Sequence, residues 1–312
     1  MKKIFLYAVV IVSIPFFVVL FWENKTREQL KEITLNYLSN VMVRVKRESS
    51  GEIQNILLEE YVVGVVAGEM PVTFEMEALK AQSVASRSYV IKRLGMNQNL
   101  DYDVVDTVSN QVYLDEGQLK EKWGNNYVEY INKIKKAVNE TSMEYLEYDG
   151  EVIDAMFFST SNGYTEDSGV VFSNSLPYLK SVESSFDEEV SPVFKKTTTI
   201  SLQEFYERLG LSYEKNLKVS ILQRSSSHRV VKLTINEKEF TGRDVYNKLG
   251  LRSCDFSFEQ LGSNVLIETK GYGHGVGMSQ YGAEGMAKKG YSYQDILNHY
   301  YTGTNLKKWS DN

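Results

Sequence analysis

An uncharged run at the start of the chain constrains its architecture more than any other feature. The run extends from Ile4 to Trp22 and follows Lys2 and Lys3. Its length matches the stretch that an α-helix needs to cross the hydrocarbon core of a bilayer. Positive charge ahead of the run predicts a cytoplasmic N-terminus, with the remainder of the chain on the outer side. We therefore expect a cytoplasmic start and transmembrane anchor over 1–22, in a single-pass protein of the cell membrane whose folded part is extracytoplasmic.

A cleaved signal peptide is the alternative interpretation of this run. Its apolar region would be shorter, and a cleavage site with small residues would follow it. Here the bulky Phe21 and Trp22 end the run, followed by Glu23 and Asn24. An uncleaved anchor is favoured.

The composition of the 312 residues narrows the classes of function. A net charge of −6 argues against a nucleic-acid-binding protein, which would carry a basic surplus. Cys254 is the only cysteine, and the three histidines show no HExxH or HxxxH spacing. We therefore expect no disulfide, no metal site and no cofactor. Most of the 21 tyrosines are expected in the core, but tyrosines that face solvent suit the flat faces of sugars.

Hydrophobic patterning predicts an α+β fold, with helices and strands mixed in a main domain and a smaller α+β subdomain inserted into it. In the insert, the segment Glu204–Leu211 recurs loosely as Asp244–Leu251, and each copy is typical of a short helix ended by a glycine. Segments 219–222 and 231–235 are expected to pair as strands. The predicted boundaries are 23–40 for a stalk, 41–194 and 266–306 for the main domain, and 195–265 for the insert.

The main domain is expected to begin with a strand pair and continue with helices. The expected elements are strands at 41–45 and 53–57, helices at 58–69, 73–94 and 117–140, and a hairpin over 145–158 that turns at Asp149-Gly150.

Glu69 is the first candidate for chemistry. On a helical wheel it falls near the middle of an apolar face that includes Val62, Val65 and Val66. Apolar surroundings disfavour the ionised carboxylate and raise its pKa, as a general acid near neutral pH requires. The alternative is that the helix ends before Glu69 and the side chain points into solvent at Met70-Pro71.

Arg87 is the only charged residue between Ala81 and Ile91, a stretch that reads as a mostly buried helix. A buried guanidinium requires an anionic or carbonyl partner. Three partners remain possible: Glu69, a group on a ligand, or an acidic residue in a structural ion pair.

A glycine-dense segment, Gly271–Gly282, holds His274 and Gln280. A histidine in such a loop, beside a glutamine, is a candidate for substrate contact. Ser159 and Ser161 lie in another polar loop, but no GxSxG motif supports a serine triad. A glycosidase that uses two carboxylates also remains open, since Glu166, Asp167 and Asp154 are available and no spacing selects a pair.

Five segments, in this order, resemble the stage II sporulation protein D family, also called amidase enhancers. They are Leu58–Pro71, Glu77–Tyr89, Phe158–Glu166, Pro177–Val182 and Gly271–Ala283. The resemblance covers most of 41–306, and an N-terminal anchor agrees with it.

The resemblance implies a lytic transglycosylase that cleaves the MurNAc–GlcNAc bond of peptidoglycan strands stripped of their stem peptides, leaving 1,6-anhydroMurNAc ends. Such enzymes act in engulfment during endospore formation, in the mother-cell membrane that engulfs the forespore. The implied partners are the glycan strands, the amidase and endopeptidase called stage II sporulation protein P, and stage II sporulation protein M. Glu69 matches the family's catalytic glutamate. The positions expected to contact substrate are Arg87, Tyr178, Lys180, His274, Ser159, Ser161 and Gln280.

Departures from the family pattern also carry expectations. Some relatives bind zinc with cysteines and histidines near a segment in which this chain has Ser109 and Asn110, so no such metal is expected here. Phe158 and Asn162 replace a histidine and a glycine that are frequent in the family. Two other functions stay open: a non-enzymatic wall-binding activator of an amidase, and a hydrolytic muramidase that leaves reducing ends.

Overall fold

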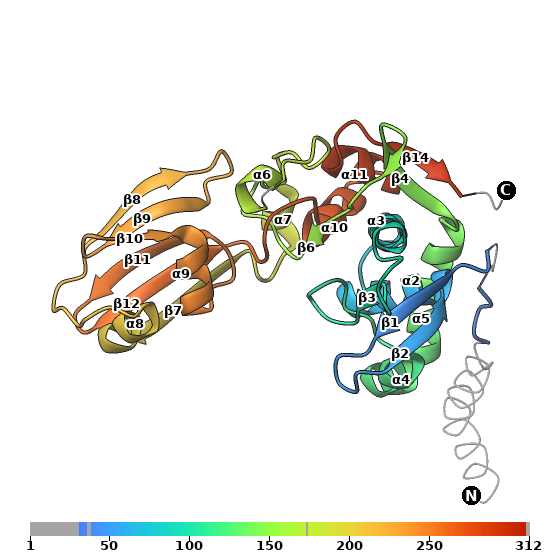
Figure 1. Cartoon of the computed structure of the whole chain (residues 1–312), viewed down its shortest axis with the longest axis horizontal. Helices are drawn as coiled ribbons and strands as arrows, with labels where there is room; N and C mark the ends of the chain where they lie inside the picture. The colour runs from blue at the N-terminus through green and yellow to red at the C-terminus, as the bar shows by residue number, and fades with distance from the viewer. Residues whose placement is uncertain (1–30, 36–38, 173, 310–312) are drawn as a thin grey trace, which may run out of the picture.

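The computed structural model describes residues 31–35, 39–172 and 174–309, which form a main lobe and an elongated insert (Figure 1). The predicted anchor over 1–22 lies outside the described residues, as does most of the stalk. Within the described ranges, no helix combines the length and the apolar character needed to cross a bilayer.

The main lobe combines helices with short sheets. Its elements before the insert are β1 (Met42–Lys46), β2 (Ile53–Leu57), α2 (Leu58–Glu69), α3 (Met76–Met96), β3 (Val104–Val105), α4 (Glu116–Trp123), a 3-10 turn (Gly124–Asn126), α5 (Tyr127–Glu140), β4 (Glu144–Tyr148), β5 (Glu151–Val152), β6 (Phe157–Phe158), α6 (Ser168–Val171) and α7 (Phe186–Val190). After the insert follow β13 (Met278–Ser279), α10 (Gln280–Lys288), α11 (Tyr293–Tyr300) and β14 (Asn305–Lys308).

Two helices, α2 and α3, form the centre of the main core. α2 is buried from Leu58 to Ala67 except at Glu60, so it is covered on nearly all sides and has no single apolar stripe. α3 contributes small side chains, among them Ala78, Ala81 and Ala85, and small residues let helices approach closely. α5 covers this pair with an apolar face that includes Ile131 and Ile134.

Several predicted elements of the main lobe are confirmed, and one is corrected. The strand pair β1–β2 is antiparallel, and α2 has the bounds expected for it. The β4–β5 hairpin turns at Asp149 and Gly150, both with positive φ. The single helix predicted over 117–140 is wrong. α4 ends at Gly124, whose φ of +50° no helix interior allows, and α5 starts three residues later.

The insert has a hydrophobic core of its own, formed by side chains between Ile200 and Ile267. Its elements are β7 (Lys195–Ser201), α8 (Leu202–Leu209), β8 (Val219–Arg224), β9 (Val230–Ile235), β10 (Lys238–Thr241), α9 (Gly242–Leu249), β11 (Asp255–Leu261) and β12 (Asn264–Lys270). They form two antiparallel sheets, ordered β10-β9-β8 and β11-β12-β7. β12 runs to Lys270, past the boundary expected at residue 265.

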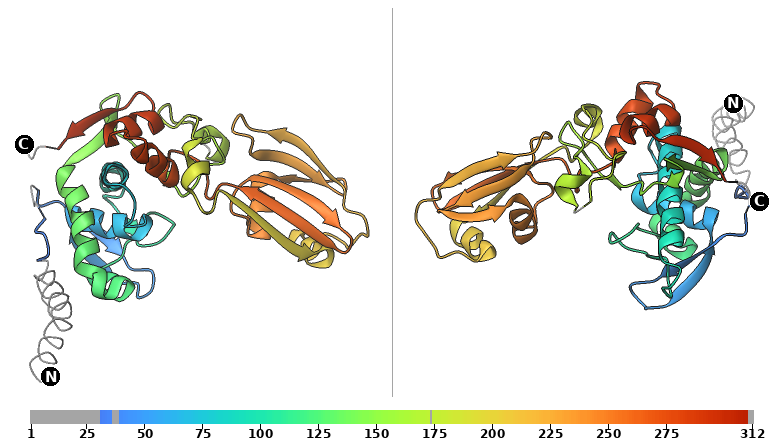
Figure 2. Two further views of the ribbon diagram at one scale, coloured as in Figure 1. Left: turned by 180° about the vertical axis from the view of Figure 1, so that it is seen from behind. Right: turned by 45° about the horizontal axis from the view of Figure 1, so that its top comes forward.

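The two repeated segments of the insert are both helices, as predicted. α8 and α9 end at Gly210 and Gly250, each in the left-handed conformation. In all three ribbon views α9 lies nearer the main lobe than α8 does (Figures 1 and 2).

The junction of the two parts is built from segments distant in sequence. β6 pairs in parallel with β13, and Tyr272 exchanges backbone hydrogen bonds with Thr160. Figure 2 shows α6 and α7 between the insert and the helices of the main lobe. The glycine-dense segment is thereby held against the loop that follows β6.

Candidate active site

Glu69 is the last residue of α2, and the local sequence explains why the helix ends there. Met70 is extended, with φ −113° and ψ 144°, because a residue before proline is displaced from the helical region, and Pro71 follows. The side chain is partly buried and does not swing into bulk solvent. Since no basic residue occupies the last turn of α2, the negative end of the helix dipole adds to the cost of ionising this carboxyl group.

A backbone N–H holds the Glu69 carboxyl group. Oε1 accepts a hydrogen bond of 2.6 Å from the backbone N–H of Val112. The segment that carries Val112 crosses α2 at two glycines one turn apart. A Cβ added to Gly68 would lie 2.5 Å from the Val112 carbonyl oxygen, and one added to Gly64 would overlap the Tyr113 ring. The two glycines therefore allow the approach that brings this N–H to the carboxyl group.

Gln280, the first residue of α10, approaches Glu69 from the opposite part of the chain. Its Nε2 donates to the Glu69 carbonyl oxygen at 3.3 Å, which places the amide beside the carboxyl group. Burial raises the pKa of Glu69, while the Val112 and Gln280 donors partly oppose that rise. The net result is a raised carboxyl pKa, with donors already placed for the ionised form.

The loop after β6 lies beside this pair. The Ser159 carbonyl oxygen accepts a 3.0 Å hydrogen bond from the Tyr281 backbone N–H, so Ser159 neighbours Gln280. Ser161 has a different environment. Its hydroxyl is buried and donates to Asp187 Oδ2 at 2.9 Å and to the Ser184 carbonyl at 2.8 Å. Ser161 therefore anchors the loop internally, and Ser159 is the serine that lies near the glutamate.

One ring nitrogen of His274 is held inside the protein. Nδ1 accepts from the Val276 backbone N–H at 3.0 Å. The ring packs against Phe158 and Phe172. The residue keeps accessible surface, yet the dense protein around its ring and the nearby Arg229 lower the pKa of His274 to about 4. A neutral imidazole whose pKa is lowered to about 4 can pack against a ligand but is a poor proton carrier near neutral pH.

Arg87 does not lie with Glu69. Its guanidinium is 0% exposed and forms a bidentate ion pair with Glu59, at 2.9 and 2.6 Å. It also donates to the Glu144 carbonyl oxygen at 2.9 Å. Of the partners left open by the sequence, the structure shows the structural ion pair. We assign Arg87 to the packing of α3 against the start of α2, because no part of its side chain is accessible to a substrate.

Tyr178 and Lys180 lie on the segment between α6 and α7. The Tyr178 hydroxyl accepts from the Asp154 backbone N–H at 3.1 Å, and its ring packs on Tyr148. Lys180 Nζ lies 3.0 Å from Asp167 Oδ2 and stays partly exposed. Neither contacts Glu69, Val112 or Gln280 through a hydrogen bond or ion pair in the described part of the chain.

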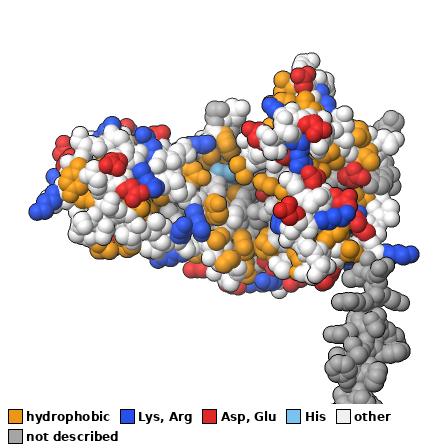
Figure 3. Space-filling model, turned by 90° about the horizontal axis from the view of Figure 1, so that it is seen from below, with side chains coloured by type: hydrophobic (Ala, Val, Ile, Leu, Met, Phe, Trp, Pro, Cys, Tyr) orange, Lys and Arg blue, Asp and Glu red, His pale blue; other side chains and the backbone are white. Residues whose placement is uncertain are grey.

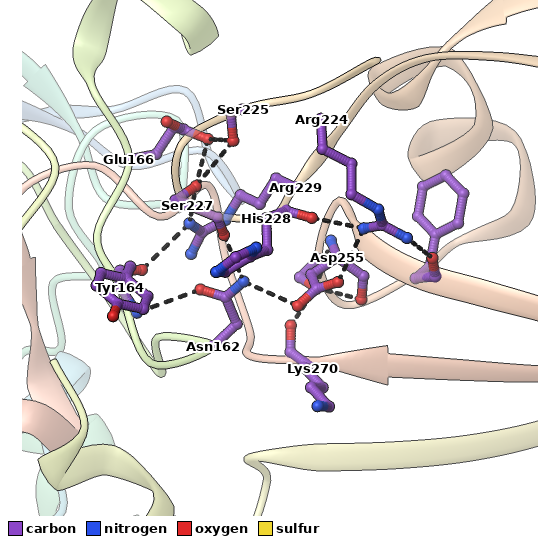
Figure 4. A network of polar contacts seen from close by, with 12 residues as sticks. Asn162, Tyr164, Glu166, Arg224, Ser225, Ser227, His228, Arg229, Asp255 and Lys270 are labelled. Atoms are coloured by element: carbon purple, nitrogen blue, oxygen red, sulfur yellow. Dashed lines mark hydrogen bonds and ion pairs between the residues drawn. The ribbon is translucent and has the colours of Figure 1, made fainter. Parts of the chain in front are cut away.

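The other carboxylates considered from the sequence are engaged elsewhere. Asp154 pairs with Arg93, and Asp167 pairs with Lys180 and caps α6. Glu166 is fully buried and accepts hydrogen bonds from the hydroxyl groups of Ser225 and Ser227 (Figure 4).

Figure 4 shows how this buried network holds the insert to the main lobe. Arg229 of the insert donates to Ser227 and to the Tyr164 carbonyl oxygen, and Asn162 donates to Asp255. Glu166 belongs to this junction and is not available as a second catalytic carboxylate. Across 31–35, 39–172 and 174–309, no group of His, Cys, Asp and Glu residues is placed to hold a metal ion.

Comparison with known proteins identifies the family of the chain. A family model described as stage II sporulation protein matches residues 46–148, which include Glu69 and Val112. The chain is 45% identical over 275 residues to stage II sporulation protein D of Bacillus amyloliquefaciens, covering 86% of this chain and 80% of that protein. The protein belongs to the stage II sporulation protein D family.

Two further relatives agree with this assignment. Stage II sporulation protein D of Bacillus subtilis (strain 168) is 42% identical over 275 residues, which cover 86% of this chain and 80% of the relative. A protein named amidase enhancer, from the same strain, is 30% identical over 304 residues. The aligned region covers 79% of this chain and 40% of that protein. The chain is thus a sporulation protein of this family, and one of its relatives is named for the enhancement of an amidase.

Two features of the site were not predicted from the sequence. The Val112 N–H is a backbone donor and leaves no trace in residue type. Gly64 and Gly68, four positions apart on α2, are the sequence signal that could have indicated the close approach, but from the sequence they only weakened the expectation of a helix. Glu59 as the partner of Arg87 was also missed, because both Glu59 and Glu69 lie on α2 and only the packing of α2 on α3 selects between them.

Proposed function

We propose that this protein is a lytic transglycosylase that cleaves the MurNAc–GlcNAc bond of denuded peptidoglycan strands, with Glu69 as its general acid and base. The observation that carries the proposal is the environment of Glu69: a partly buried carboxyl group with a raised pKa, a backbone N–H that donates to it at 2.6 Å, and the Gln280 amide beside it. The raised pKa keeps a proton on the group, and the donors stabilise the carboxylate that forms when the proton leaves.

The reaction needs only one carboxyl group of the protein. Glu69 gives its proton to the glycosidic oxygen as the bond from that oxygen to the muramic C1 breaks. The muramic C6 hydroxyl then attacks C1, and its proton passes to the Glu69 carboxylate. The products are a 1,6-anhydromuramic end and a GlcNAc residue with a free 4-hydroxyl, and Glu69 is again protonated.

The surroundings of Glu69 favour this reaction over a hydrolase that uses two carboxylates. Such an enzyme holds its second carboxylate about 5–9.5 Å from the first, with a free face toward the sugar. Glu166 is buried in the junction, and Asp154 and Asp167 are both paired. No other carboxylate hydrogen bonds to Val112 or Gln280 among the described residues.

We further propose that the protein is held in the cell membrane by residues 1–22 and acts on its outer face during engulfment. The uncharged N-terminal run and the family membership support this location. The relative named amidase enhancer supports joint action with a wall amidase, for which stage II sporulation protein P is the candidate, with stage II sporulation protein M as a further partner in the same membrane.

Product analysis with a matched pair of variants tests the proposal. Wild type, Glu69→Gln and Glu60→Gln are incubated with denuded strands, and the muramic ends are identified by mass spectrometry. Glu60 lies on the same helix, is exposed, and serves as control. Anhydromuramic ends from wild type and Glu60→Gln, with none from Glu69→Gln, support the proposal. No product from any of the three favours a non-enzymatic activator, and reducing muramic ends would show a hydrolase.

A further inference from the structure

The insert carries a basic pocket that the proposed chemistry at Glu69 does not use. A cavity of about 160 Å³ opens between the ends of α8 and α9 and the β7–β12 strands. Lys196, Arg208 and Arg252 line it, and no Asp or Glu side chain does. Thr198 adds a hydroxyl group, whereas the Thr269 hydroxyl donates to the Lys196 carbonyl oxygen at 3.4 Å. Three cations with a hydroxyl group and no lining carboxylate form a site with the chemistry of an anion receptor.

Among the residues that the structure describes, two of the three cations have no carboxylate partner. Arg208 pairs with Glu204 and donates to the Leu249 carbonyl oxygen, so its charge is largely matched. In the described part of the chain, Lys196 and Arg252 form no ion pair with an Asp or Glu. Positive charge without a partner, at the mouth of a cavity, is available to an anion from outside.

The charge of the insert differs in sign from that of the whole protein. Residues 195–265 contain 12 Lys and Arg against 8 Asp and Glu, a net charge of +4, whereas the complete chain carries −6. Figure 3 shows Lys and Arg side chains where the insert meets the main lobe. An acidic protein that keeps a basic module attracts anionic polymers to that module.

An exposed tyrosine links the pocket to the segment that leads to Gln280. The Arg252 guanidinium lies 5.2 Å from the centre of the Tyr272 ring, and Tyr272 is 46% exposed. Tyr272 belongs to the glycine-dense segment, eight positions before Gln280, and its backbone is fixed by paired hydrogen bonds to Thr160. A rigid, accessible aromatic ring beside a cation suits a sugar that carries a carboxylate.

We propose that Tyr272 and the pocket around Lys196 and Arg252 form a distal subsite that binds the lactyl carboxylate of a muramic residue on a denuded glycan strand. The inference rests on the proposed function, since it assigns a second contact for the same substrate. Removal of the stem peptide leaves one free carboxylate on each muramic residue, whereas an intact stem converts it to an amide. The cavity is smaller than the roughly 300–1,000 Å³ pockets that enclose drug-sized ligands, so it admits a carboxylate on a short stem while the sugar stays outside, on Tyr272. The subsite would thereby select strands that an amidase has already processed.

Binding of the full-length chain to immobilised strands, in detergent, tests this subsite without catalysis. All proteins carry Glu69→Gln, so that no strand is cleaved during the measurement. The variants are Lys196→Gln with Arg252→Gln, and the control is Lys218→Gln, an exposed cation of the insert outside the pocket. The strands are offered with free carboxylates and with carboxylates blocked by amidation.

The subsite predicts a specific pattern in the four affinities. The double variant binds free-carboxylate strands roughly tenfold more weakly than the control does. Amidation weakens binding to the control by a similar factor and leaves the double variant unchanged, because the two changes remove the same contact. Equal affinity of the double variant and the control for free-carboxylate strands overturns the proposal. The proposal is also overturned if the double variant loses the same affinity, relative to the control, for free-carboxylate strands and for amidated strands. That result would show only general attraction between charges.

Two further arms keep the outcome decisive. Poly(glycerol phosphate) offers phosphate in place of carboxylate. If the control binds this polymer more tightly than it binds glycan strands, and the double variant loses that binding, the pocket is a phosphate site and the proposal of a carboxylate subsite is overturned. Arg252→Lys keeps the charge but not the planar stack on Tyr272, so an intermediate loss is expected even if the double variant folds poorly. Anhydromuramic product from the protein with native Glu69 is measured separately, so failure of the subsite and failure of the transglycosylase are distinguishable.

Discussion

The Val112 backbone N–H donates a 2.6 Å hydrogen bond to the Glu69 carboxyl group across a crossing of two chain segments that only glycine allows. Burial favours the neutral acid, and this N–H favours the carboxylate. A group that must give up a proton and take one back within one turnover benefits from both influences. The close crossing at Gly68 therefore positions the N–H that sets the acidity of Glu69, the last residue of α2.

Replacing Gly68 tests whether this crossing is needed for activity. Gly68→Ala places a Cβ 2.5 Å from the Val112 carbonyl oxygen, which must move and take the N–H with it. We expect a loss of about 1–3 kcal/mol in the free energy of unfolding, together with a large loss of glycan cleavage. Gly95→Ala is the matched control, because Gly95 lies in α3 with nothing within 4 Å of an added Cβ. That variant should gain roughly 0.5–1 kcal/mol and keep full activity. Similar behaviour of the two variants in denaturant unfolding and in the strand assay would contradict the role given to the crossing.

Gln280→Ala should change the pH dependence of cleavage. The rate requires protonated Glu69, so it falls as pH rises through the pKa of that group. Removing a donor to the carboxylate raises the pKa of Glu69 further, and the alkaline limb of the pH–rate profile should move to higher pH. The maximal rate should fall about tenfold, because an amide that favours the ionised carboxylate is lost. Gln203→Ala, on the exposed face of α8, should leave both unchanged. An alkaline limb that stays in place in Gln280→Ala would remove Gln280 from the site.

Arg87→Gln should destabilise the protein rather than weaken substrate binding. The change leaves the Glu59 carboxylate buried without its ion-pair partner, which costs about 3–5 kcal/mol. Adding Glu59→Gln should recover part of that loss in chemical denaturation. Lys120→Gln, which breaks an exposed pair with Glu116, is the control and should change stability little. A stable Arg87→Gln protein with a raised KM for strands would instead support a substrate contact.

His274 should stay neutral well below neutral pH. Its ring carbon resonances, assigned by comparison with His274→Gln, should titrate near 4 in an NMR pH series. Because the folded-state pKa is lower than the unfolded value of 6.5, the unfolded chain binds the proton first as pH falls. The free energy of unfolding therefore falls as pH decreases from about 6.5 to about 4, and above that window this histidine costs no stability. A midpoint near 6.5 would show that the surrounding protein and Arg229 do not disfavour the charged ring.

The sequence allowed much of the fold to be predicted because the local signals were strong. Met70-Pro71 marked the end of α2, and Gly210 and Gly250 marked the ends of the two insert helices. Gly124 was an equally visible signal for the end of α4, but the apolar periodicity on both sides of it masked the break. Periodicity continues across a short 3-10 turn, so it cannot by itself show that a helix is interrupted.

The candidate site was less predictable, since tertiary contacts define it. Glu69 and Gln280 were both selected from the sequence, but their contact depends on the docking of α10 against the end of α2. Arg87 matched a family segment and yet lies in the core, because its neighbours in the sequence do not reveal which face of α3 meets Glu59. Ser159 and Ser161 are two positions apart, and only the Asp187 network shows which of them is committed to structure.

Cleavage of denuded strands in water enriched in oxygen-18 tests the central claim most directly. If the muramic C6 hydroxyl attacks C1 and the Glu69 carboxylate takes its proton, no water enters the product, and mass spectrometry should find anhydromuramic ends without the heavy isotope. Glu69→Gln should give neither anhydromuramic ends nor reducing muramic ends. Reducing muramic ends that carry oxygen-18, from wild type and not from Glu69→Gln, would contradict the account by showing that water is the nucleophile.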